Sequence, residues 1–425
     1  MNKKITLLGL SLALMATTFT SCTKDEEEAG PQFLELTAAG PVSGKWEGNS
    51  IVTITEDVVI PEGESLTIEA GAQVIFAGDN LGTAEAPEFQ VRGNLYILGQ
   101  EGNMVTFSVE EANQTEANRF MGLWGGIQCA ATCGELAINY AKIEYAGAPA
   151  GPNSIFVEQG EDEGDPRYAI IYGNLIGKVA IHNSIIQNTT DDAFRSLGGQ
   201  LSVVGNTFAY VGETGGEALN IKSGVEGDMA YNLFYNCATN GTKWSNSGER
   251  SPQTNCTSYN NTFVNCGWRR NKEGRGASVN IEKGARGQSY NQLIVNCKYG
   301  VRVVGGDDEA DLPNTSVDYA FYFGNEQIMI DEFYPTHGIF TSADSPNDIY
   351  GAINENDPKF VDYNVATGKL ENLDYADYDF HLAGGSLALT GAKTNFSPKN
   401  GALVIGGVTY TNPSPSAHFG AFGSN

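Results

Sequence analysis

The residues best suited to chemistry form a basic cluster inside an acidic chain. Among 425 residues, 51 Asp and Glu outnumber 25 Lys and Arg, and the formal net charge is −26. Between Lys243 and Arg302, however, ten Lys or Arg accompany only three acids, so this stretch carries +7 and the remainder −33. The stretch includes WRRNKEGR, residues 268–275. An indole that packs on a sugar ring, beside guanidinium groups that engage carboxylate or sulfate, would suit an acidic glycan.

Short apolar runs bounded by Gly, Asn and Asp recur along the chain and predict strands rather than helices. YNLFYNC (231–237), YNNTFVNC (259–266) and YNQLIVNC (290–297) are copies of one unit. GNTFAYVG (205–212) and NSIIQN (183–188) are weaker copies of the same unit. A second strand ending in glycine follows each of the five copies, and these glycines fall at 199, 224, 248, 284 and 306, in steps of 25, 24, 36 and 22 residues. Such periods are typical of stacked repeats that bury a continuous core. The pattern predicts an all-β parallel β-helix.

Alternation along the second strand of each repeat separates core positions from outward positions. Counted back from the final glycine, the third and fifth positions are mostly apolar, so the second and fourth should face solvent. Neighbouring repeats lie about 4.8 Å apart, so five outward side chains span roughly 19 Å, the length of a few sugar units. The 36-residue step indicates an insertion, and we expect WRRNKEGR to overhang the row as a loop. The fourth positions are Arg195, Asn220, Trp244, Asn280 and Arg302, the second positions include Lys222 and Glu282, and the loop adds Trp268, Arg269, Arg270, Lys272 and Arg275.

Catalysis is an alternative to binding. A polysaccharide lyase acting on uronic-acid glycans needs a base, here an Arg or Lys, and a cation that neutralises the carboxylate. Ca²⁺ would be its cofactor, held by acids such as Asp191, Asp192, Glu213 and Glu217. No compact motif joins these residues, so the sequence leaves open whether the chain is an enzyme. A further alternative is a non-catalytic accessory or adhesion subunit whose basic cluster contacts a protein or balances charge. The net charge argues against nucleic acid as a partner.

Cysteines recur in the repeats, each after an asparagine. Their equivalent positions predict free thiols stacked in the core, and the asparagines predict a ladder at a turn with left-handed backbone. Elsewhere, Cys129 and Cys133 lie close enough in sequence for a small disulfide, and the sequence leaves that bond open. No further ligands at zinc spacing accompany them. The repeated pairs are Asn236 and Cys237, Asn265 and Cys266, and Asn296 and Cys297.

The N-terminus predicts export. Residues 1–22, MNKKITLLGLSLALMATTFTSC, combine Lys3 and Lys4 with an apolar run and small residues before Cys22. TSC resembles a bacterial lipobox, in which the cysteine carries lipid, and TKDEEEAGP resembles the acidic export tag of Bacteroidetes-type surface lipoproteins. The resemblance implies a signal peptide over residues 1–21, a lipid-anchored acidic tether over 22–40, and a place on the outer face of the outer membrane.

The flanks of the repeats resemble bacterial surface proteins with a right-handed parallel β-helix, the pectin-lyase-like fold. GESLTIEAGAQVIFAG (63–78) is similar to their opening coils, and DPKFVD (357–362), DFHLAGGSLALTGA (379–392) and HFGAFG (418–423) to their closing segment. The resemblance implies one right-handed β-helix domain over residues 41–425. In this family the function varies from adhesion to polysaccharide cleavage. We therefore expect a cell-surface lipoprotein that binds an anionic polysaccharide, with an outer-membrane protein as a further candidate partner.

Overall fold

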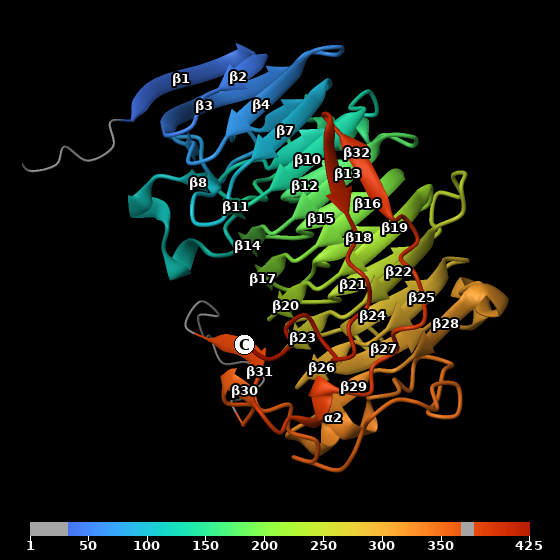
Figure 1. The fold of residues 1–425 in the computed structure, drawn as a ribbon. Coiled ribbons are helices and arrows are strands. Elements are labelled where there is room, and N and C mark those ends of the chain that lie inside the picture. Colours follow the sequence, from blue (N-terminus) through green and yellow to red (C-terminus); the bar gives the residue numbers. More distant parts are fainter. Residues whose placement is uncertain (1–32, 367–377) are drawn as a thin grey trace, which may run out of the picture. The chain divides into compact units, whose positions relative to one another are not determined.

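The computed structural model describes residues 33–366 and 378–425. In these ranges the chain forms mostly β-strands, and the strands of the two large sheets are parallel (Figure 1). The helices are short: α1 (Ile155–Glu158) and α2 (Gln327–Asp331). None of the helices within the described ranges has the length and hydropathy needed to cross a membrane. The prediction is confirmed in its coarser form: the described residues are mostly β, and their large sheets are parallel.

A ten-stranded sheet takes one strand from each repeat, and each strand pairs in parallel with the equivalent strand of the next repeat. The strands alternate inward and outward side chains, as in the pattern of β4, where Leu66 and Ile68 are buried. The strands in order are β2 (Gly44–Trp46), β4 (Ser65–Glu69), β7 (Asn94–Leu98), β10 (Glu135–Asn139), β13 (Lys178–His182), β16 (Gly199–Val204), β19 (Val225–Ala230), β22 (Asn255–Tyr259), β25 (Arg286–Tyr290) and β28 (Thr315–Asp318).

A nineteen-stranded sheet consists of two parallel ladders that share the long strand β3 (Ser50–Ile60). Ladder 1 continues through β1 (Leu34–Pro41), β5 (Gln73–Phe76), β8 (Val105–Val109), β11 (Ala141–Glu144), β14 (Ile185–Thr189), β17 (Thr207–Val211), β20 (Leu233–Tyr235), β23 (Thr262–Val264), β26 (Leu293–Val295) and β29 (Phe321–Phe323). Ladder 2 continues through β6 (Phe89–Val91), β9 (Ile127–Cys129), β12 (Ile170–Tyr172), β15 (Phe194–Ser196), β18 (Leu219–Ile221), β21 (Thr242–Ser245), β24 (Ala277–Glu282) and β27 (Tyr299–Val303).

The core consists of inward side chains that stack on their equivalents in neighbouring repeats. Phe208, Phe234 and Phe263 form such a stack, with ring centroids 5.3 and 4.7 Å apart and planes inclined by 9° and 12°. Equivalent residues stack because in-register parallel strands place them directly above one another. Since each repeat buries its apolar side chains only against its neighbours, the core is continuous along the stack.

Amide side chains also stack at the turn that precedes ladder 1. Asn232 Oδ1 accepts hydrogen bonds from the backbone N and from Nδ2 of Asn206, both at 3.0 Å. Asn261 Oδ1 accepts the two equivalent hydrogen bonds from Asn232. This ladder was missed in the sequence, which predicted stacked amides at Asn236, Asn265 and Asn296 instead. Those three do have the predicted left-handed backbone, with φ of 51°, 56° and 53°.

The cysteines of the repeats lie in the core as predicted. Cys237, Cys266 and Cys297 are free and buried, and the backbone N of Cys266 lies 3.4 Å from Cys297 Sγ. Cys129 and Cys133 are also free and buried. Burial raises the pKa of Cys266 and Cys297 well above the usual range, so both thiols stay protonated.

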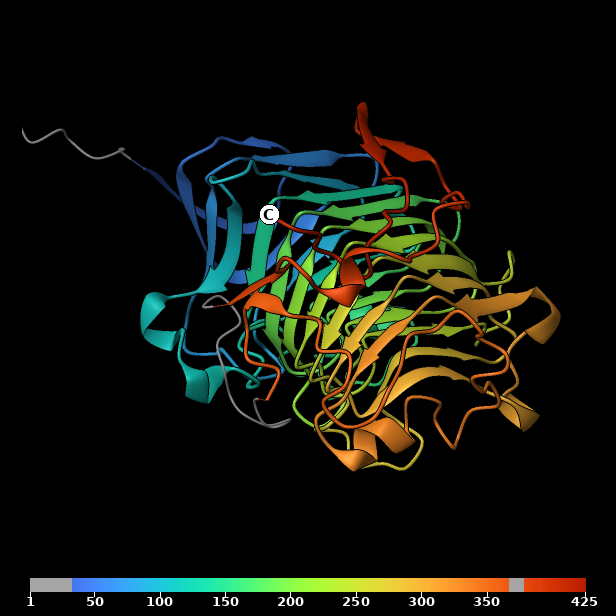
Figure 2. The same cartoon turned by 60° about the horizontal axis from the view of Figure 1, so that its bottom comes forward.

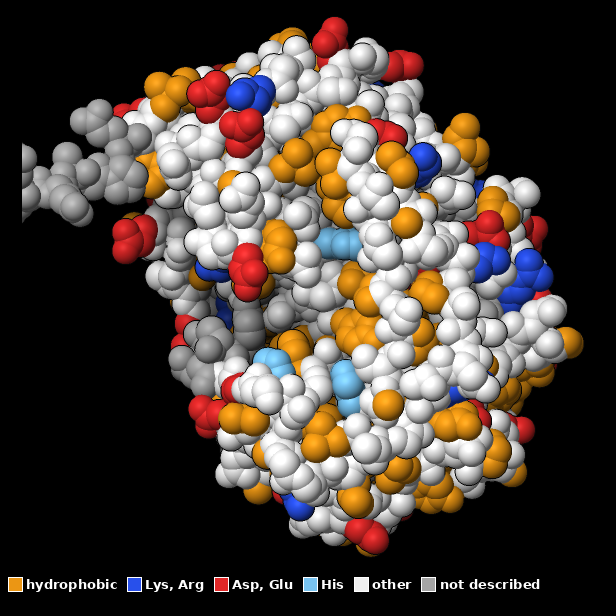
Figure 3. Space-filling model, viewed as in Figure 1, with side chains coloured by type: hydrophobic (Ala, Val, Ile, Leu, Met, Phe, Trp, Pro, Cys, Tyr) orange, Lys and Arg blue, Asp and Glu red, His pale blue; other side chains and the backbone are white. Residues whose placement is uncertain are grey.

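The C-terminal segment runs back along the outside of the repeats (Figures 1 and 2). Its hairpins are β30 (Phe360–Asp362) with β31 (Asp379–Leu382), and β32 (Ala402–Ile405) with β33 (Val408–Thr411). Phe380 and Phe419 pack on outward apolar residues of ladder 1, and Leu403 and Ile405 pack on Ala180. Figure 3 shows the face that this segment crosses, where hydrophobic and histidine side chains gather around a hollow.

The N-terminal predictions fall largely outside the described residues. The signal peptide, Cys22 and the acidic run all lie before residue 33 and stay predictions. Within the range predicted as tether, Leu34–Pro41 forms β1, which pairs with β3. The parallel sheet therefore begins several residues before the predicted boundary at residue 41.

Candidate functional site

The polar row expected from the repeats lies on ladder 2, on the face opposite the core. The register pairs Arg195 with Asn220, and Asn280 with Arg302. Between them, Lys243 pairs with both Asn220 and Asn280. The five side chains come from five neighbouring strands, β15, β18, β21, β24 and β27. The row thus consists of three cations separated by two amides.

Trp244 does not belong to this row, and its predicted outward position is wrong. It pairs with Ile221 and Ile281 and is fully buried in the core. The count back from Gly248 assumed the spacing of the other repeats, but the segment from Lys243 to Gly248 is one residue longer. A slip of one residue moves a strand side chain to the opposite face.

Hydrogen bonds and ion pairs connect the first half of the row. Arg195 donates from Nη1 to Glu161 Oε1 at 2.7 Å and from Nε to Asp192 Oδ2 at 2.8 Å. The same Asp192 oxygen accepts from Asn220 Nδ2 at 2.8 Å, and that amide also donates to Glu217 Oε2 at 3.2 Å. These groups satisfy one another, as buried polar groups must.

Lys243 extends the network to the second half. Its Nζ lies 3.7 Å from Glu217 Oε1 and 3.3 Å from Glu282 Oε1. The other oxygen of Glu282 accepts from Asn280 Nδ2 at 3.0 Å and from Arg275 Nη1 at 3.3 Å. Lys243 therefore bridges carboxylates from two different repeats.

Loops cover most of this row, so it is not the open surface that the sequence predicted. Arg302 donates from Nη1 to Asn280 Oδ1 at 2.8 Å and from Nε to the His337 carbonyl at 2.9 Å. Asn220 and Asn280 are each 1 % exposed, and Glu282 is 3 % exposed. A ligand would reach only the edge of the row.

Part of the loop WRRNKEGR holds the loop itself in place. Trp268 Nε1 donates to the Asn296 carbonyl at 2.8 Å. The Arg269 guanidinium donates to the Gly212 carbonyl at 2.7 Å and contacts Asn236 Oδ1. Burial lowers the pKa of Arg269. Both side chains form hydrogen bonds with residues of the repeats, and this does not support the prediction that they face a ligand.

The rest of the loop lines a polar hollow at the edge of ladder 2, with a volume of about 280 Å³. Arg270 donates from Nη1 to the Thr214 carbonyl at 3.1 Å. The Lys272 side chain is exposed and has no ion pair or hydrogen bond among the residues that the structure describes. We call this space the loop hollow. Its lining residues are Asp191, Gly215, Gly216, Glu217, Thr239, Lys243, Arg270, Lys272 and Arg275.

The carboxyl groups at the loop hollow differ in pKa. Burial and the neighbouring Asp192 carboxylate raise the pKa of Glu217 to about 7, although Lys243 opposes the shift. Burial and the same neighbour raise the pKa of Asp191 well above its usual range. Burial would raise the pKa of Asp192 too, but Arg195 and several hydrogen bonds outweigh burial and hold it at about 2. At neutral pH, therefore, Asp192 is charged and Glu217 exchanges its proton, whereas the Asp191 carboxyl holds its proton more strongly than an exposed aspartate does.

Lys222, which was also predicted on the outward face, lies next to the network rather than in the hollow. Burial, together with Arg195 and Lys243, lowers its pKa to about 8. Its ammonium group remains mostly charged at neutral pH and loses the charge more readily than an exposed lysine does.

The sequence prediction missed Lys243 and gave Glu217 and Asp192 only as calcium ligands. A repeat signal was available for the two acids. Asp192, Glu217 and Asn240 occupy the same position in successive repeats, because Phe194, Leu219 and Thr242 pair in register. Lys243 was hidden by the longer segment before Gly248.

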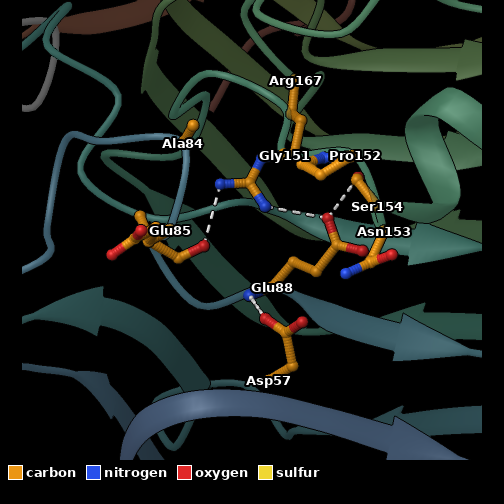
Figure 4. A pocket seen from close by; sticks show the side chains of 10 residues that line it. Asp57, Ala84, Glu85, Glu88, Gly151, Pro152, Asn153, Ser154 and Arg167 are labelled. Carbon is orange, nitrogen blue, oxygen red and sulfur yellow. Dashed lines mark hydrogen bonds and ion pairs between the residues drawn. The ribbon is translucent and has the colours of Figure 1, made fainter.

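A second polar pocket, of about 300 Å³, lies between the β6 region and the loop before α1 (Figure 4). Arg167 donates from Nη1 to Glu88 Oε2 at 2.9 Å, and Ser154 Oγ and the Ile155 backbone N donate to the same carboxylate. The remaining Arg167 donors bind carbonyls, including that of Ala86 at 2.9 Å. Each charged group in this buried pair is already satisfied, so the pair serves as a clamp between loops.

Among the described residues, no group of three or more His, Cys, Asp or Glu side chains is placed to hold a metal ion. Three of the four acids proposed for calcium already accept hydrogen bonds from the protein: Asp191 from the Asp192 backbone N at 2.8 Å, Asp192 from the Glu217 backbone N at 2.7 Å, and Glu217 from Asn220 Nδ2 at 3.2 Å. The residues present therefore do not fit a calcium site.

Comparison of the chain with protein-family models, with curated proteins and with solved structures finds no match.

Proposed function

We propose that this chain is a binding protein for an extracellular polysaccharide that carries carboxylate or sulfate groups, and that the loop hollow is the binding site. The observation that carries the proposal is the exposed Lys272 beside Arg270 and Arg275, at the mouth of a polar cavity. Arginine forks match carboxylate and sulfate oxygens, and a lysine adds an unpaired positive charge. When protonated, the Glu217 carboxyl, whose pKa is raised to about 7, would donate a hydrogen bond to a sugar hydroxyl or to an anion.

The fold that we propose for this function is a right-handed parallel β-helix over the described residues. It is supported by the parallel pairing of every ladder strand with its equivalent in the next repeat. Connections between parallel strands are right-handed in almost all proteins, which supports the hand. Limited proteolysis that separates the two ladders into independently folded fragments would contradict this fold.

Binding should be tested with polygalacturonate, a sulfated glucan and a neutral glucan at several salt concentrations. The double variant Arg270→Gln, Lys272→Gln should bind both anionic polymers roughly tenfold more weakly at low salt, a loss of about 1.4 kcal/mol. Its affinity should also depend less on salt, because exposed charges are screened over about 8 Å at physiological ionic strength. The control Lys45→Gln, Lys359→Gln removes the same charge from exposed positions elsewhere and should bind like the wild type.

Equal affinity for the neutral and the anionic polymers would overturn the proposal. So would an unchanged affinity in the double variant. In that case the basic loop would be a docking face for a protein, as in an accessory or adhesion subunit of an outer-membrane complex.

A polysaccharide lyase for uronic-acid glycans is the second candidate. The observation in its favour is the Glu217 carboxyl, which exchanges a proton near neutral pH within a few ångströms of Lys243. Cations that neutralise a uronate carboxylate would then lie beside a group that can transfer a proton. Incubation with polygalacturonate and measurement at 235 nm, where unsaturated ends absorb, separates this reaction from binding alone. A steady rise that Glu217→Gln abolishes would establish the lyase.

The location that we propose is the outer face of the outer membrane, through lipid on Cys22. The support is the lipobox-like TSC and the acidic run that follows it. Protease added to intact cells should remove the protein, and changing residues 24–28 to alanine should protect it by turning it inward. Equal protease sensitivity of both forms would contradict the export tag, and release of soluble wild-type protein would contradict the anchor.

A further inference from the structure

We infer that the chain has a second site for an acidic sugar, on the outer face of the ten-stranded sheet and separate from the loop hollow. The site is a cavity of about 430 Å³. Its floor comes from outward side chains of two neighbouring strands, Asn255 and Thr257 on β22 and Arg286 and Gln288 on β25. Its walls come from the turn before β28 and from the C-terminal segment, which crosses the sheet here. The lining residues are Asn255, Thr257, Arg286, Gly287, Gln288, Asn314, Ser397 and Lys399.

The position of the floor follows from the register of the sheet. Asn255 pairs with Arg286, and Thr257 pairs with Gln288. Residues two apart on a strand point to the same face, so the four side chains form a two-by-two patch. The inward neighbours between them are Cys256, which is buried in the core, and Gly287.

Arg286 is the residue that indicates an anionic ligand. Its backbone N donates to the Thr254 carbonyl at 3.1 Å, but its Nε is buried without a hydrogen-bond partner among the described residues. The guanidinium also has no ion pair among them. A buried donor that lacks a partner costs free energy, which a ligand oxygen would recover. A guanidinium fork suits the paired oxygens of a carboxylate or a sulfate.

The surrounding charges favour the same ligand. None of the lining residues is a carboxylate, and of the two cations in the lining only Lys399 has an ion pair among the described residues. Lys399 is held at the wall by Glu226, with Nζ 3.2 Å from Oε1, and by its backbone N, which donates to Asp228 Oδ1 at 2.6 Å. Asp311, next to the turn, is engaged by Asn314 Nδ2 at 2.9 and 3.0 Å.

The uncharged lining would recognise the rest of a sugar. The side chains of Asn255, Thr257, Gln288 and Ser397 make no hydrogen bonds in the described part of the chain, so their donors and acceptors are available. Cavities for small molecules typically measure roughly 300–1,000 Å³. A lining of amides, hydroxyls and cations excludes an apolar ligand and matches a saccharide unit that bears one anionic group.

The test uses purified wild-type protein with three probes: D-glucuronate, D-glucose 6-sulfate and D-glucose. Binding is followed by ligand-observed saturation-transfer NMR and by titration. Wild type should bind one or both anionic probes and not glucose, and the preferred probe identifies carboxylate or sulfate as the natural group. Arg286→Gln should weaken that binding at least tenfold, and Arg286→Lys, which keeps the charge but loses the fork, should weaken it less.

Two controls make the outcome specific. Lys283→Gln removes an exposed cation three residues away and should bind like the wild type. Arg270→Gln, Lys272→Gln should also leave binding of these small probes at Arg286 unchanged, so a failure of the loop hollow does not affect this result. Lys399→Gln provides a second variant of the site, and it should weaken binding if Arg286→Gln does not fold. Unchanged binding in folded Arg286→Gln or equal binding of glucose would overturn the inference, as would the lack of saturable binding by the wild type.

Discussion

Lys243 and Trp244 are neighbours in the chain but belong to different environments, because they point to opposite faces of β21. The Lys243 ammonium lies between the carboxylates of Glu217 and Glu282, at 3.7 and 3.3 Å. The Trp244 indole is fully buried between Ile221 and Ile281. One strand therefore supplies both a bridge in the charged network and a large part of the core beneath it.

Trp244→Ala should destabilise the fold rather than alter binding. Removing a large aromatic side chain from a packed core costs about 3–5 kcal/mol. Chemical denaturation followed by circular dichroism would measure the loss, and Trp244→Phe, which fills most of the space, should cost clearly less. A loss below 1 kcal/mol for the alanine variant would show that the indole is not in the core.

Stability should fall with rising pH in a way that depends on Glu217. Its pKa is about 7 in the folded protein, above the ordinary value of 4.5, so the folded state binds more protons between these pH values. The contribution of Glu217 is therefore fully present below about pH 4.5 and is lost as the pH rises through about 7, on the order of 3 kcal/mol in total. Urea denaturation across this range should show a shallower fall for Glu217→Gln.

The control for this prediction is Glu213→Gln, which changes an exposed acid in the same loop. Its stability should follow the wild-type pH dependence. Equal pH dependence of Glu217→Gln and the wild type would contradict a raised pKa for Glu217.

Breaking the buried pair of Arg167 and Glu88 should be strongly destabilising. Arg167→Met leaves the Glu88 carboxylate, which is 1 % exposed, without its cation, and such changes cost about 3–5 kcal/mol. The double variant Glu88→Gln, Arg167→Met removes both charges and should recover part of that loss. Thermal unfolding of the wild type, Arg167→Met and the double variant would measure these differences in stability. A double variant no more stable than Arg167→Met would argue against an uncompensated charge as the cause of the loss.

The stacked thiols should not react until the protein unfolds. Cys237, Cys266 and Cys297 are buried, so a thiol reagent cannot reach them in the folded protein. Ellman's reagent should therefore label them only in denaturant, and Cys266→Ala should cost on the order of 1 kcal/mol, as small core truncations do. Rapid labelling of the native protein would show that the stack opens to solvent.

Periodicity predicted the fold because it depends on many residues at once. Equivalent glycines recur through five repeats and equivalent asparagines and cysteines through three, so an error in one repeat does not change the class of structure. The residues of the row were assigned from single positions, and one extra residue before Gly248 was enough to exchange Lys243 for Trp244. The pairing partners of the row, such as Glu161 with Arg195, come from loops of other repeats and have no local signature.

The roles of the individual residues in the basic loop could not be predicted from the sequence either. Composition identified WRRNKEGR as a cluster of cations but could not separate Arg269, which binds backbone carbonyls, from Lys272, which faces solvent. That separation depends on the path of the loop across the 211–216 segment. Similarly, the lack of a partner for Arg286 depends on which side chains the C-terminal segment brings to the sheet.

The C-terminal segment also affects how the stacked repeats can unfold. In an array whose repeats touch only their nearest neighbours, unfolding can start at one end and stop after any repeat. Here Leu403 and Ile405, near the end of the chain, pack against Ala137 and Ala180 of early repeats, and Phe419 packs on ladder 1 beside the late ones. Loosening the segment would uncover early and late repeats together. Because one segment packs on both early and late repeats, we expect the stack to unfold more cooperatively than an array whose repeats contact only their neighbours.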